Sequence, residues 1–287
     1  MNDMTSPGNL YIVATPIGHM DDITIRAINV LGRVRVIAAE DTRNTARLLS
    51  HHRIGAPLVS CHEHNEEDRA AELLARLECG EDVALVSDAG TPTLSDPGYR
   101  LVRMAVDKGI KVIPIPGPSA AVSALSASGL PTDAFVFVGF LPRKRGKRSE
   151  MLEALKRQPM TLIFYESPRR IRALIQEVSI VMGDREAVLC REMTKTHEEF
   201  IRGRLSEILA VLSARPDVKG ECTFLVAGRG EDDAPSPEVI RCEIEAALAE
   251  HGVKLSGISR RLAEKYGVSK NVIYQEALAI KERKQKE

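Results

Sequence analysis

The sequence predicts an α/β protein with mainly parallel sheets, followed by a small helical region. Short apolar runs alternate with amphipathic helical patterns along most of the 287 residues, as in strands joined by crossover helices. The apolar runs are mostly continuous, which is typical of strands that are covered on both faces. Trp is absent and aromatic residues make up only 4% of the chain, so we expect an aliphatic core.

Nine apolar runs are the expected strands. They lie at 10–14, 34–39, 57–60, 82–86, 110–115, 134–140, 161–165, 186–190 and 222–227. Between them, apolar residues recur at helical spacing over 22–31 and 66–77. A third helix is expected over 97–106, with Asp96 as its N-cap and Pro97 at the first helical position.

Two breaks in this pattern divide the chain. A cluster of Pro and Gly residues interrupts it after the fifth strand and places a domain boundary near residue 116. The polar stretch 228–238 is typical of a linker, and the residues after it look helical. We therefore expect an N-terminal α/β domain over 1–116, a second α/β domain over 117–230, and a linker with a helical tail over 231–287.

Composition and the termini exclude several classes of protein. Forty basic residues balance forty acidic ones, so net charge gives no indication of nucleic-acid binding. The first ten residues lack a signal-peptide pattern, and the longest strongly apolar run, 134–141, is too short to cross a bilayer. Five scattered cysteines without a CxxC pair are expected in a protein of the reducing cytoplasm.

Four loops rich in small and polar residues each begin where an expected strand ends. They lie at 14–22, 87–98, 116–121 and 165–170. Ligands bind at the carboxyl ends of strands in α/β sheets, so four such loops indicate one shared cleft. In the loop SDAGTPTLSDPG (87–98), ten of twelve residues are Ser, Asp, Gly, Thr or Pro, far more than a turn needs. This loop is expected to hold a ligand.

Missing motifs restrict the kind of ligand. The chain contains no P-loop sequence, no dinucleotide fingerprint after a strand, and no Rossmann-type methyltransferase glycine motif. The expected cleft instead offers small side chains, backbone amides and the carboxylate of Asp88. A neutral or cationic small molecule suits it better than a triphosphate, which disfavours a nucleotide-dependent hydrolase.

Eight sequence blocks resemble those of a known family. They are ATPIGHMDDIT (14–24), AAEDTR (38–43), HEHNE (62–66), LVSDAGTPTLSDPG (85–98), PIPGPSA (114–120), GFLPRK (139–144), FYESP (164–168) and REMTKTHEE (191–199). They resemble the tetrapyrrole methylase superfamily, and within it the ribosomal RNA small subunit methyltransferase I family, and the resemblance covers roughly residues 9–230. The resemblance implies two α/β domains, a homodimer, and S-adenosylmethionine held in a bent shape in the cleft between the domains. It also implies 2′-O-methylation of a cytidine ribose in the decoding region of 16S rRNA, with the assembled 30S subunit as the expected partner.

The resemblance assigns the cofactor contacts to loops of both domains. The expected contacts are Pro16, Ser87, Asp88, Ala89, Gly90, Leu94, Ser119, Ala120 and Tyr165. Gly90 would let the backbone approach the cofactor closely. Asp88 is expected to bind away from the transferred methyl, because an anion beside the sulfonium would stabilise the ground state.

A ribose hydroxyl must lose its proton to attack the methyl group. The candidates for the proton acceptor are Lys195, Asp41 and Glu166, and no motif decides among them. Lys195 has an alternative role as a fixed cation that grips a phosphate beside the target. We favour this clamp because many charged neighbours argue against the dry pocket that a neutral lysine needs.

Basic residues are concentrated locally despite the zero net charge. The segment RKRGKR (143–148) is either a flexible cationic loop that binds a phosphate backbone or a solvated loop. The candidate RNA contacts are Arg43, His62, His64, Arg143, Lys144, Arg145, Lys147, Arg148, Arg169 and Arg170. His62 and His64 lie in CHEHNEE (61–67), which could also start a helix with Asn65 as N-cap. No second ligand cluster has zinc spacing, so we expect no metal site.

The tail 255–278 resembles a helix-turn-helix with Gly267 at the turn. It could dock RNA, or it could be a packing or dimerisation hairpin. Two other functions stay open. A tetrapyrrole-ring methyltransferase would need neither the basic segment nor the tail, and a helix-turn-helix regulator would bind S-adenosylmethionine without turnover.

Overall fold

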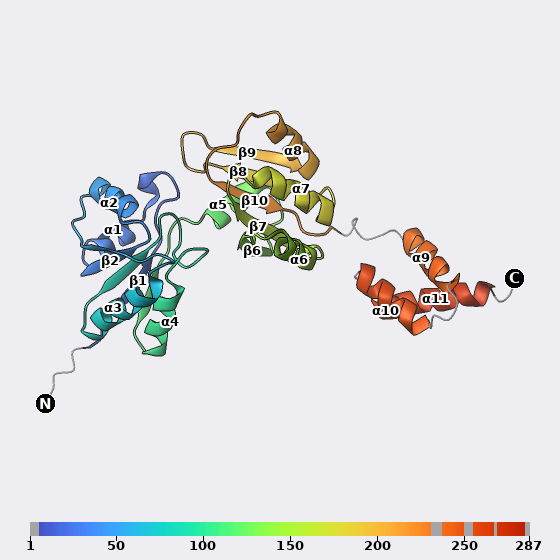
Figure 1. Cartoon of the computed structure of the whole chain (residues 1–287), viewed down its shortest axis with the longest axis horizontal. Helices are drawn as coiled ribbons and strands as arrows, with labels where there is room; N and C mark the ends of the chain where they lie inside the picture. The colour runs from blue at the N-terminus through green and yellow to red at the C-terminus, as the bar shows by residue number, and fades with distance from the viewer. Residues whose placement is uncertain (1–5, 231–236, 250–254, 267–268, 285–287) are drawn as a thin grey trace.

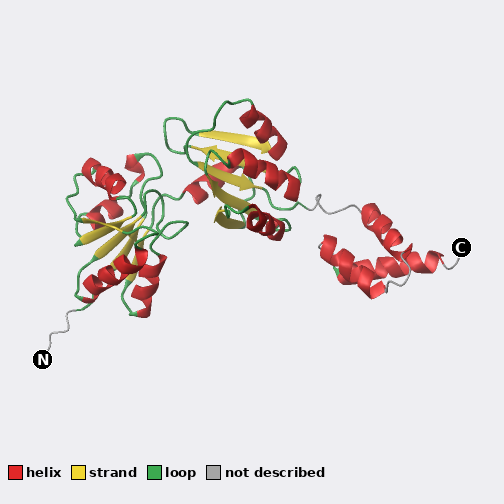
Figure 2. Ribbon diagram, viewed as in Figure 1, coloured by secondary structure: helices red, strands yellow, loops and turns green. Residues whose placement is uncertain are grey.

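The computed structural model describes residues 6–230, 237–249, 255–266 and 269–284 (Figure 1). These residues form two five-stranded sheets with helices packed on them, and three further helices near the C-terminus (Figure 2). Within this part of the chain, no helix combines the length and the apolar character that crossing a membrane requires.

The first sheet is entirely parallel, with the strand order β3-β2-β4-β1-β5. Its elements are β1 (Leu10–Val13), the 3-10 helix η1 (Met20–Asp22), α1 (Ile25–Leu31), β2 (Val36–Ala39), α2 (Thr42–His51), β3 (Leu58–Ser60), α3 (Glu66–Glu78), β4 (Val83–Val86), α4 (Tyr99–Asp107) and β5 (Val112–Ile115). Alternate residues of β2 enter two different apolar clusters. Ile37 and Ala39 pack with α1 and α2, whereas Val36 and Ala38 pack with α3 and α4. Both faces of the sheet are covered, as the continuous apolar runs predict.

The second sheet has the order β6-β7-β10-β8-β9. Its elements are α5 (Ala120–Ser128), β6 (Phe135–Phe140), α6 (Arg145–Leu155), β7 (Thr161–Glu166), α7 (Ile171–Met182), β8 (Glu186–Arg191), β9 (Glu199–Arg204), α8 (Leu205–Ser213) and β10 (Cys222–Val226). Only β6 and β7 pair in parallel, and the other three pairings are antiparallel. The expectation of mainly parallel sheets is therefore wrong for this sheet. Neither the direction of these strands nor the insertion of β10 between β7 and β8 follows from apolar runs.

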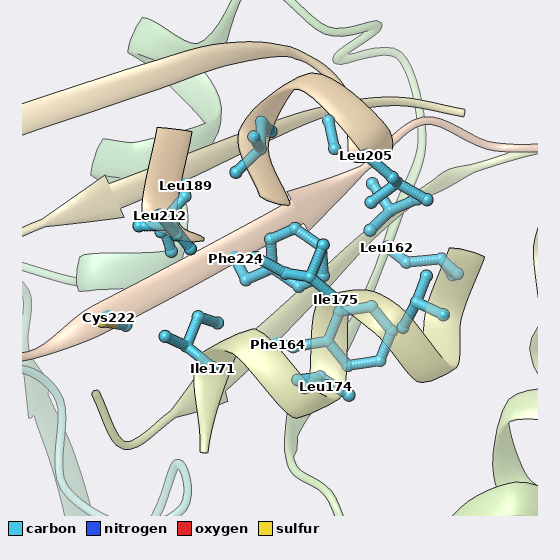
Figure 3. Close-up of a cluster of buried hydrophobic side chains, with 14 of the residues drawn as sticks. Leu162, Phe164, Ile171, Leu174, Ile175, Leu189, Leu205, Leu212, Cys222 and Phe224 are labelled. Carbon is cyan, nitrogen blue, oxygen red and sulfur yellow. The ribbon is translucent and has the colours of Figure 1, made fainter. Parts of the chain in front are cut away.

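The core of the second unit lies between its sheet and helices α6, α7 and α8. Phe164 and Phe224, from neighbouring strands, place their rings 6.1 Å apart, and α7 packs Ile171, Leu174 and Ile175 against them (Figure 3). The opposite face is covered by α5, in an apolar cluster that also includes Ile17 from the loop after β1. This cluster joins the two sheet-bearing units.

The start of α4 differs from the sequence-based expectation. Asp96 does not cap α4 and Pro97 precedes it, since the helix begins at Tyr99 after Gly98, whose φ is +114°. The backbone N–H groups of Gly98 and Arg100 instead donate to the Glu66 carboxylate, each at 3.0 Å. The cap thus comes from α3, a tertiary contact that local sequence does not reveal.

The basic segment is not a loop throughout. Arg145 begins α6, so the last four residues of RKRGKR are helical. Asn65 does precede α3 as expected, but its side-chain oxygen accepts the N–H of His62 rather than capping the helix.

The C-terminal helices are α9 (Pro237–Ala249), α10 (Leu255–Tyr266) and α11 (Lys270–Lys284). They share a small apolar core that includes Ile244, Ile258, Leu262 and Ile273. The expected helix-turn-helix corresponds to α10 and α11, whereas its turn residues, Gly267 and Val268, lie outside the described residues.

Candidate functional site

Direct contacts join the four loops that the sequence singles out. After the neighbouring strands β1 and β4, the Thr15 N–H donates to the Gly90 oxygen at 2.8 Å, and the Gly90 N–H donates back at 3.0 Å. The Thr91 hydroxyl donates to the Pro118 oxygen at 3.3 Å, which adds the 116–121 loop. The Ala121 N–H donates to the Tyr165 hydroxyl at 3.2 Å, which adds the end of β7. The loops therefore form one continuous wall.

A pocket opens between the 14–22 and 87–98 loops, α2, and two residues of the second unit, Lys195 of the 192–198 loop and Glu221. Its lining residues are Pro16, Ile17, Gly18, Met20, Asn44, Thr45, Arg47, Leu48, Ser87, Asp88, Ala89, Lys195 and Glu221. Four of the expected cofactor contacts, Pro16, Ser87, Asp88 and Ala89, are among them. Lys195 and Glu221 belong to the second sheet's unit, so the pocket lies between the two units.

The other expected cofactor contacts lie beside this pocket rather than in its lining. Gly90 follows Ala89, and Leu94 is 48% exposed farther along the same loop. Ser119 and Ala120 begin α5, and the Tyr165 ring packs edge to face on Phe137 and Phe140. A ligand that touched both groups of residues would have to run along the 87–98 loop.

Close backbone approach brings the two units together at Gly18. A Cβ atom there would lie 2.6 Å from the Lys195 Cγ and 2.6 Å from the Thr194 hydroxyl oxygen. The His19 N–H donates to the same hydroxyl at 3.0 Å. Only glycine fits at position 18, and this contact holds Lys195 beside the pocket.

The loops bordering the pocket also carry strained backbone. Among the described residues, five that are not glycine have positive φ, and four of these lie in two loops: Thr93, Ser95, Glu192 and Thr194. Such conformations cost on the order of 1–3 kcal/mol each and persist where the surroundings impose them, often at functional sites. The strain thus supports a functional role for the 87–98 and 192–198 loops.

Three carboxylates, Glu40, Asp88 and Asp96, gather beside the pocket. Burial, followed by the charge of Glu40, raises the pKa of Asp96 to about 6, against an opposing hydrogen bond from Ser87. Burial, followed by the charge of Asp88, raises the pKa of Glu40. Asp88 also holds the start of α2, accepting the Asp41 N–H and the Asn44 side-chain N–H, each at 3.0 Å. The cluster creates a negative potential that suits a cationic ligand.

The sequence did not single out Glu40 and Asp96 as site residues. Glu40 belongs to the block AAEDTR (38–43), and Asp96 was expected to cap a helix. Also missed were Asn44, Arg47 and Leu48, which share one face of α2 and line the pocket. Their i, i+3, i+4 spacing is the signal that could have identified them.

The three candidate proton acceptors are all engaged with partners. The Lys195 Nζ lies 3.0 Å from carboxylate oxygens of both Glu192 and Glu221. Burial pulls the pKa of Lys195 down, but the hydrogen bonds and charges of Glu221 and Glu192 outweigh this effect and leave the pKa raised. Lys195 therefore stays protonated, which suits a phosphate clamp and not a base.

The two carboxylate candidates are held by arginines. Asp41 caps α2, and its hydrogen bonds with the Arg43 side chain and backbone lower its pKa to about 2, which makes it a weak base. Glu166 is buried at the end of β7, where it accepts the Ser167 N–H at 2.6 Å and the Arg170 Nε–H at 2.8 Å.

The candidate RNA contacts fall into exposed and structural groups. The Arg43 side chain is 87% exposed although it pairs with Asp41. The other exposed candidates are Arg143, Lys144, Arg145, Lys147, Arg169 and His64.

The remaining candidates have structural partners or are buried. Arg148 is only 17% exposed and makes two hydrogen bonds of 2.6 Å to Glu177 of α7. Its assignment to RNA is not supported, because this pair fastens α6 to α7. Arg170 is likewise held by Glu166, and the Nδ1 atom of His62 is buried without a partner.

Known proteins of one family resemble this chain. Residues 9–209 match the tetrapyrrole (corrin/porphyrin) methylases. The ribosomal RNA small subunit methyltransferase I of Micromonospora olivasterospora is 47% identical over 281 residues, covering 98% of this chain and 90% of the relative. The protein of the same name from Escherichia coli O157:H7 is 47% identical over 277 residues, covering 95% and 96%.

Solved structures with the same fold include two methyltransferases that are named for a precorrin and for uroporphyrin-III. A cobalt precorrin-4 methyltransferase has a TM-score of 0.58 and 19% identity, covering 76% of this chain and 94% of that one. The uroporphyrin-III C-methyltransferase of Thermus thermophilus, complexed with S-adenosylhomocysteine, has a TM-score of 0.56 and 21% identity, covering 77% and 97%. At these identities, the similarity shows the fold alone.

Proposed function

The chain belongs to the ribosomal RNA small subunit methyltransferase I family of the tetrapyrrole methylases, and from this premise we propose that it methylates the ribose 2′-hydroxyl of a cytidine in the decoding region of 16S rRNA. The observation that carries the proposal is the pocket between the two units, with Lys195 in its wall. Full-length similarity to relatives named for the small-subunit RNA favours this substrate over a tetrapyrrole ring.

S-adenosylmethionine is the methyl donor, and when bound it supplies an electrophilic methyl group on a sulfonium. The chemistry of the site fits a cationic cofactor, because Glu40, Asp88 and Asp96 gather beside a pocket with apolar walls such as Ile17 and Leu48. Pro16, Ser87 and Ala89 would flank the cofactor there. The part of the cofactor that runs along the 87–98 loop would be contacted by the remaining expected residues, Gly90, Leu94, Ser119, Ala120 and Tyr165.

The chain's own residues then hold the RNA and take up a proton. Lys195, which Glu192 and Glu221 hold through ion pairs, would grip the phosphate beside the target ribose. Direct methyl transfer needs chiefly an aligned oxygen, methyl and sulfur, so such positioning supplies much of the rate. Glu166 and Asp41 remain candidates for the proton acceptor. Asp96 joins them, since its pKa of about 6 is closer to neutrality and its partner Ser87 lines the pocket.

The surrounding cations extend the RNA surface. Phosphates of the RNA would be contacted by the exposed residues Arg43, Arg143, Lys144, Arg145, Lys147 and Arg169. The C-terminal helices α10 and α11 would dock RNA outside the cleft.

The same proposal includes a homodimer, the 30S subunit as the substrate, and domain boundaries near residues 116 and 230. Sedimentation of the purified chain checks the dimer.

Methyl transfer to competing substrates tests the proposal. Purified protein is incubated with tritiated S-adenosylmethionine and with 30S subunits that lack the modification, naked 16S rRNA, or a uroporphyrinogen. The proposal predicts incorporation of one methyl group per subunit and none into the tetrapyrrole. Methylation of the tetrapyrrole alone, or cofactor binding without turnover on any substrate, contradicts it.

A further inference from the structure

A separate cluster of metal-ligating side chains lies at the rim of the pocket. Asp21, His51 and His52 each place one possible ligand atom, a carboxylate oxygen or a ring nitrogen, so that all three atoms lie within 4.8 Å of one another. None of the three lines the pocket, and the proposed methyl transfer uses none of them. Met20 directly precedes Asp21, and Leu48 lies one helical turn before His52, whose N–H donates to the Leu48 oxygen; both Met20 and Leu48 line the pocket.

Local structure fixes each member of the cluster. Asp21 lies in η1, where its N–H donates to the Nδ1 atom of His19 at 3.3 Å. His51 ends α2 and His52 is its C-cap. The His51 Nε2 lies 3.0 Å from the Asp21 carboxylate, and the His52 Nε2 lies 3.2 Å from the Met20 carbonyl oxygen.

The hydrogen bond of His52 has the form found around metal sites. A histidine that donates one ring N–H to a backbone carbonyl keeps its other nitrogen unprotonated and oriented, as metal-ligating histidines commonly do. The C-terminal end of α2 also carries a partial negative charge that favours a cation. His51 and Asp21 have 48% and 69% of their side chains exposed, so water can reach an ion there.

We propose that Asp21, His51 and His52 bind a divalent transition-metal ion of the zinc class at the rim of the pocket. Imidazole and carboxylate ligands suit this class, and three protein ligands leave room for water on the ion. The bound ion would fasten η1 to the end of α2. Because these two segments contribute Met20 and Leu48 to the pocket, the ion would stiffen one pocket wall.

Zinc affinity tests the proposal directly. The full chain without a histidine tag, carrying Cys79→Ser and Cys242→Ser to remove its exposed thiols, is titrated with Zn²⁺ against a chromophoric chelator. One ion should bind, and His51→Ala and Asp21→Asn should each weaken its affinity by at least about tenfold. Asp22→Asn, a neighbouring exposed carboxylate of η1, is the matched control and should leave the affinity unchanged.

Thermal unfolding with and without Zn²⁺ is the second measurement. An ion that binds the native state raises the unfolding temperature by mass action, so the rise should occur in the parent and be absent in Asp21→Asn. Equal zinc affinity in parent and variants, or no rise in the parent, overturns the proposal and leaves His51 and Asp21 as a hydrogen-bonded pair. Neither readout involves methyl transfer, so its outcome is independent of the proposed function.

Discussion

Gly90 illustrates what a single residue contributes to the site. Its φ of +81° allows the reciprocal hydrogen bonds with Thr15. An added Cβ would meet only Ile17 at 3.6 Å and Pro118 at 3.8 Å, both ordinary contacts. The sequence suggests that glycine at position 90 lets the backbone approach a ligand closely. The structure shows that the positive φ of this residue also favours glycine. A larger side chain, as in Gly90→Val, would therefore strain the loop itself as well as fill space near the cofactor.

The milder change Gly90→Ala should lower the free energy of unfolding by about 1–2 kcal/mol, because a side chain is disfavoured at positive φ. It should also weaken S-adenosylhomocysteine binding, measured by calorimetry, because the loop at the pocket shifts. Gly55→Ala is the control, since a Cβ atom there meets nothing within 4 Å. Unchanged stability and affinity in Gly90→Ala would remove this residue from the site.

Asp96 should make stability depend on pH. Its pKa of about 6 in the folded chain lies above the ordinary value of 3.8. The folded state therefore binds more protons than the unfolded state between these values, and stability falls as pH rises from about 4 to 6. Asp96→Asn should raise the free energy of unfolding at pH 7 by about 1–2 kcal/mol, after allowance for solvent screening.

Urea unfolding of parent and Asp96→Asn at several pH values measures this difference. The stability gained by Asp96→Asn should vanish near pH 4, where Asp96 of the parent is largely protonated in the folded chain. If the two proteins lose stability equally between pH 4 and 6, Asp96 is not the buried acid described here.

Lys195 should act on RNA affinity rather than on the chemical step. Lys195→Ala removes the cation held by Glu192 and Glu221, so it should weaken RNA binding and leave the single-turnover rate at saturating RNA nearly unchanged. Lys195→Arg keeps the charge and should retain most of the affinity. A lower saturated rate in Lys195→Ala that is partly rescued by raising the pH would instead identify a base.

At the scale of secondary structure, the basic residues around the start of α6 have two different expected roles. The exposed ones should bind RNA, and Arg148 should stabilise the fold. Changing Arg143, Lys144, Arg145 and Lys147 to Ala should weaken RNA binding. The slope of the logarithm of the binding constant against the logarithm of the salt concentration should also become shallower, by roughly 0.7–0.9 for each phosphate that the variant no longer neutralises. Arg148→Ala is the contrasting variant and should instead cost about 2 kcal/mol of stability, because it leaves Glu177 without its partner. Filter binding over a range of salt concentrations measures the slope, and an unchanged slope in the fourfold variant would make this segment merely solvated.

Strand positions were predictable from the sequence to the extent that strands are buried. β2 and β4 are buried at every residue and stand out as apolar runs, whereas β9 reads EFIRGR and buries only Ile201. It was missed because an edge strand can carry charges, and these typically protect an edge from further pairing. Strand direction in the second sheet and the start of α4 depend on tertiary contacts, so local sequence could not supply them.

At the scale of the whole molecule, convergence of the loops was predictable and the pocket's full lining was not. Parallel strands place their carboxyl ends at one edge, which is why the loops after β1 and β4 meet. The contributions of α2, Lys195 and Glu221 depend instead on how the second unit packs against the first, through contacts such as Gly18 with Thr194. No pattern within either half of the sequence reports that packing.

The position of the transferred methyl group decides whether the chain modifies a ribose of the small-subunit RNA. After reaction with unmodified 30S subunits, 16S rRNA is digested to nucleosides and the labelled nucleoside is identified by mass spectrometry. We expect 2′-O-methylcytidine from one position in the decoding region, formed by the parent and reduced in Lys195→Ala at limiting RNA. A methyl group on a base, or on a ribose elsewhere in the subunit, would contradict this expectation.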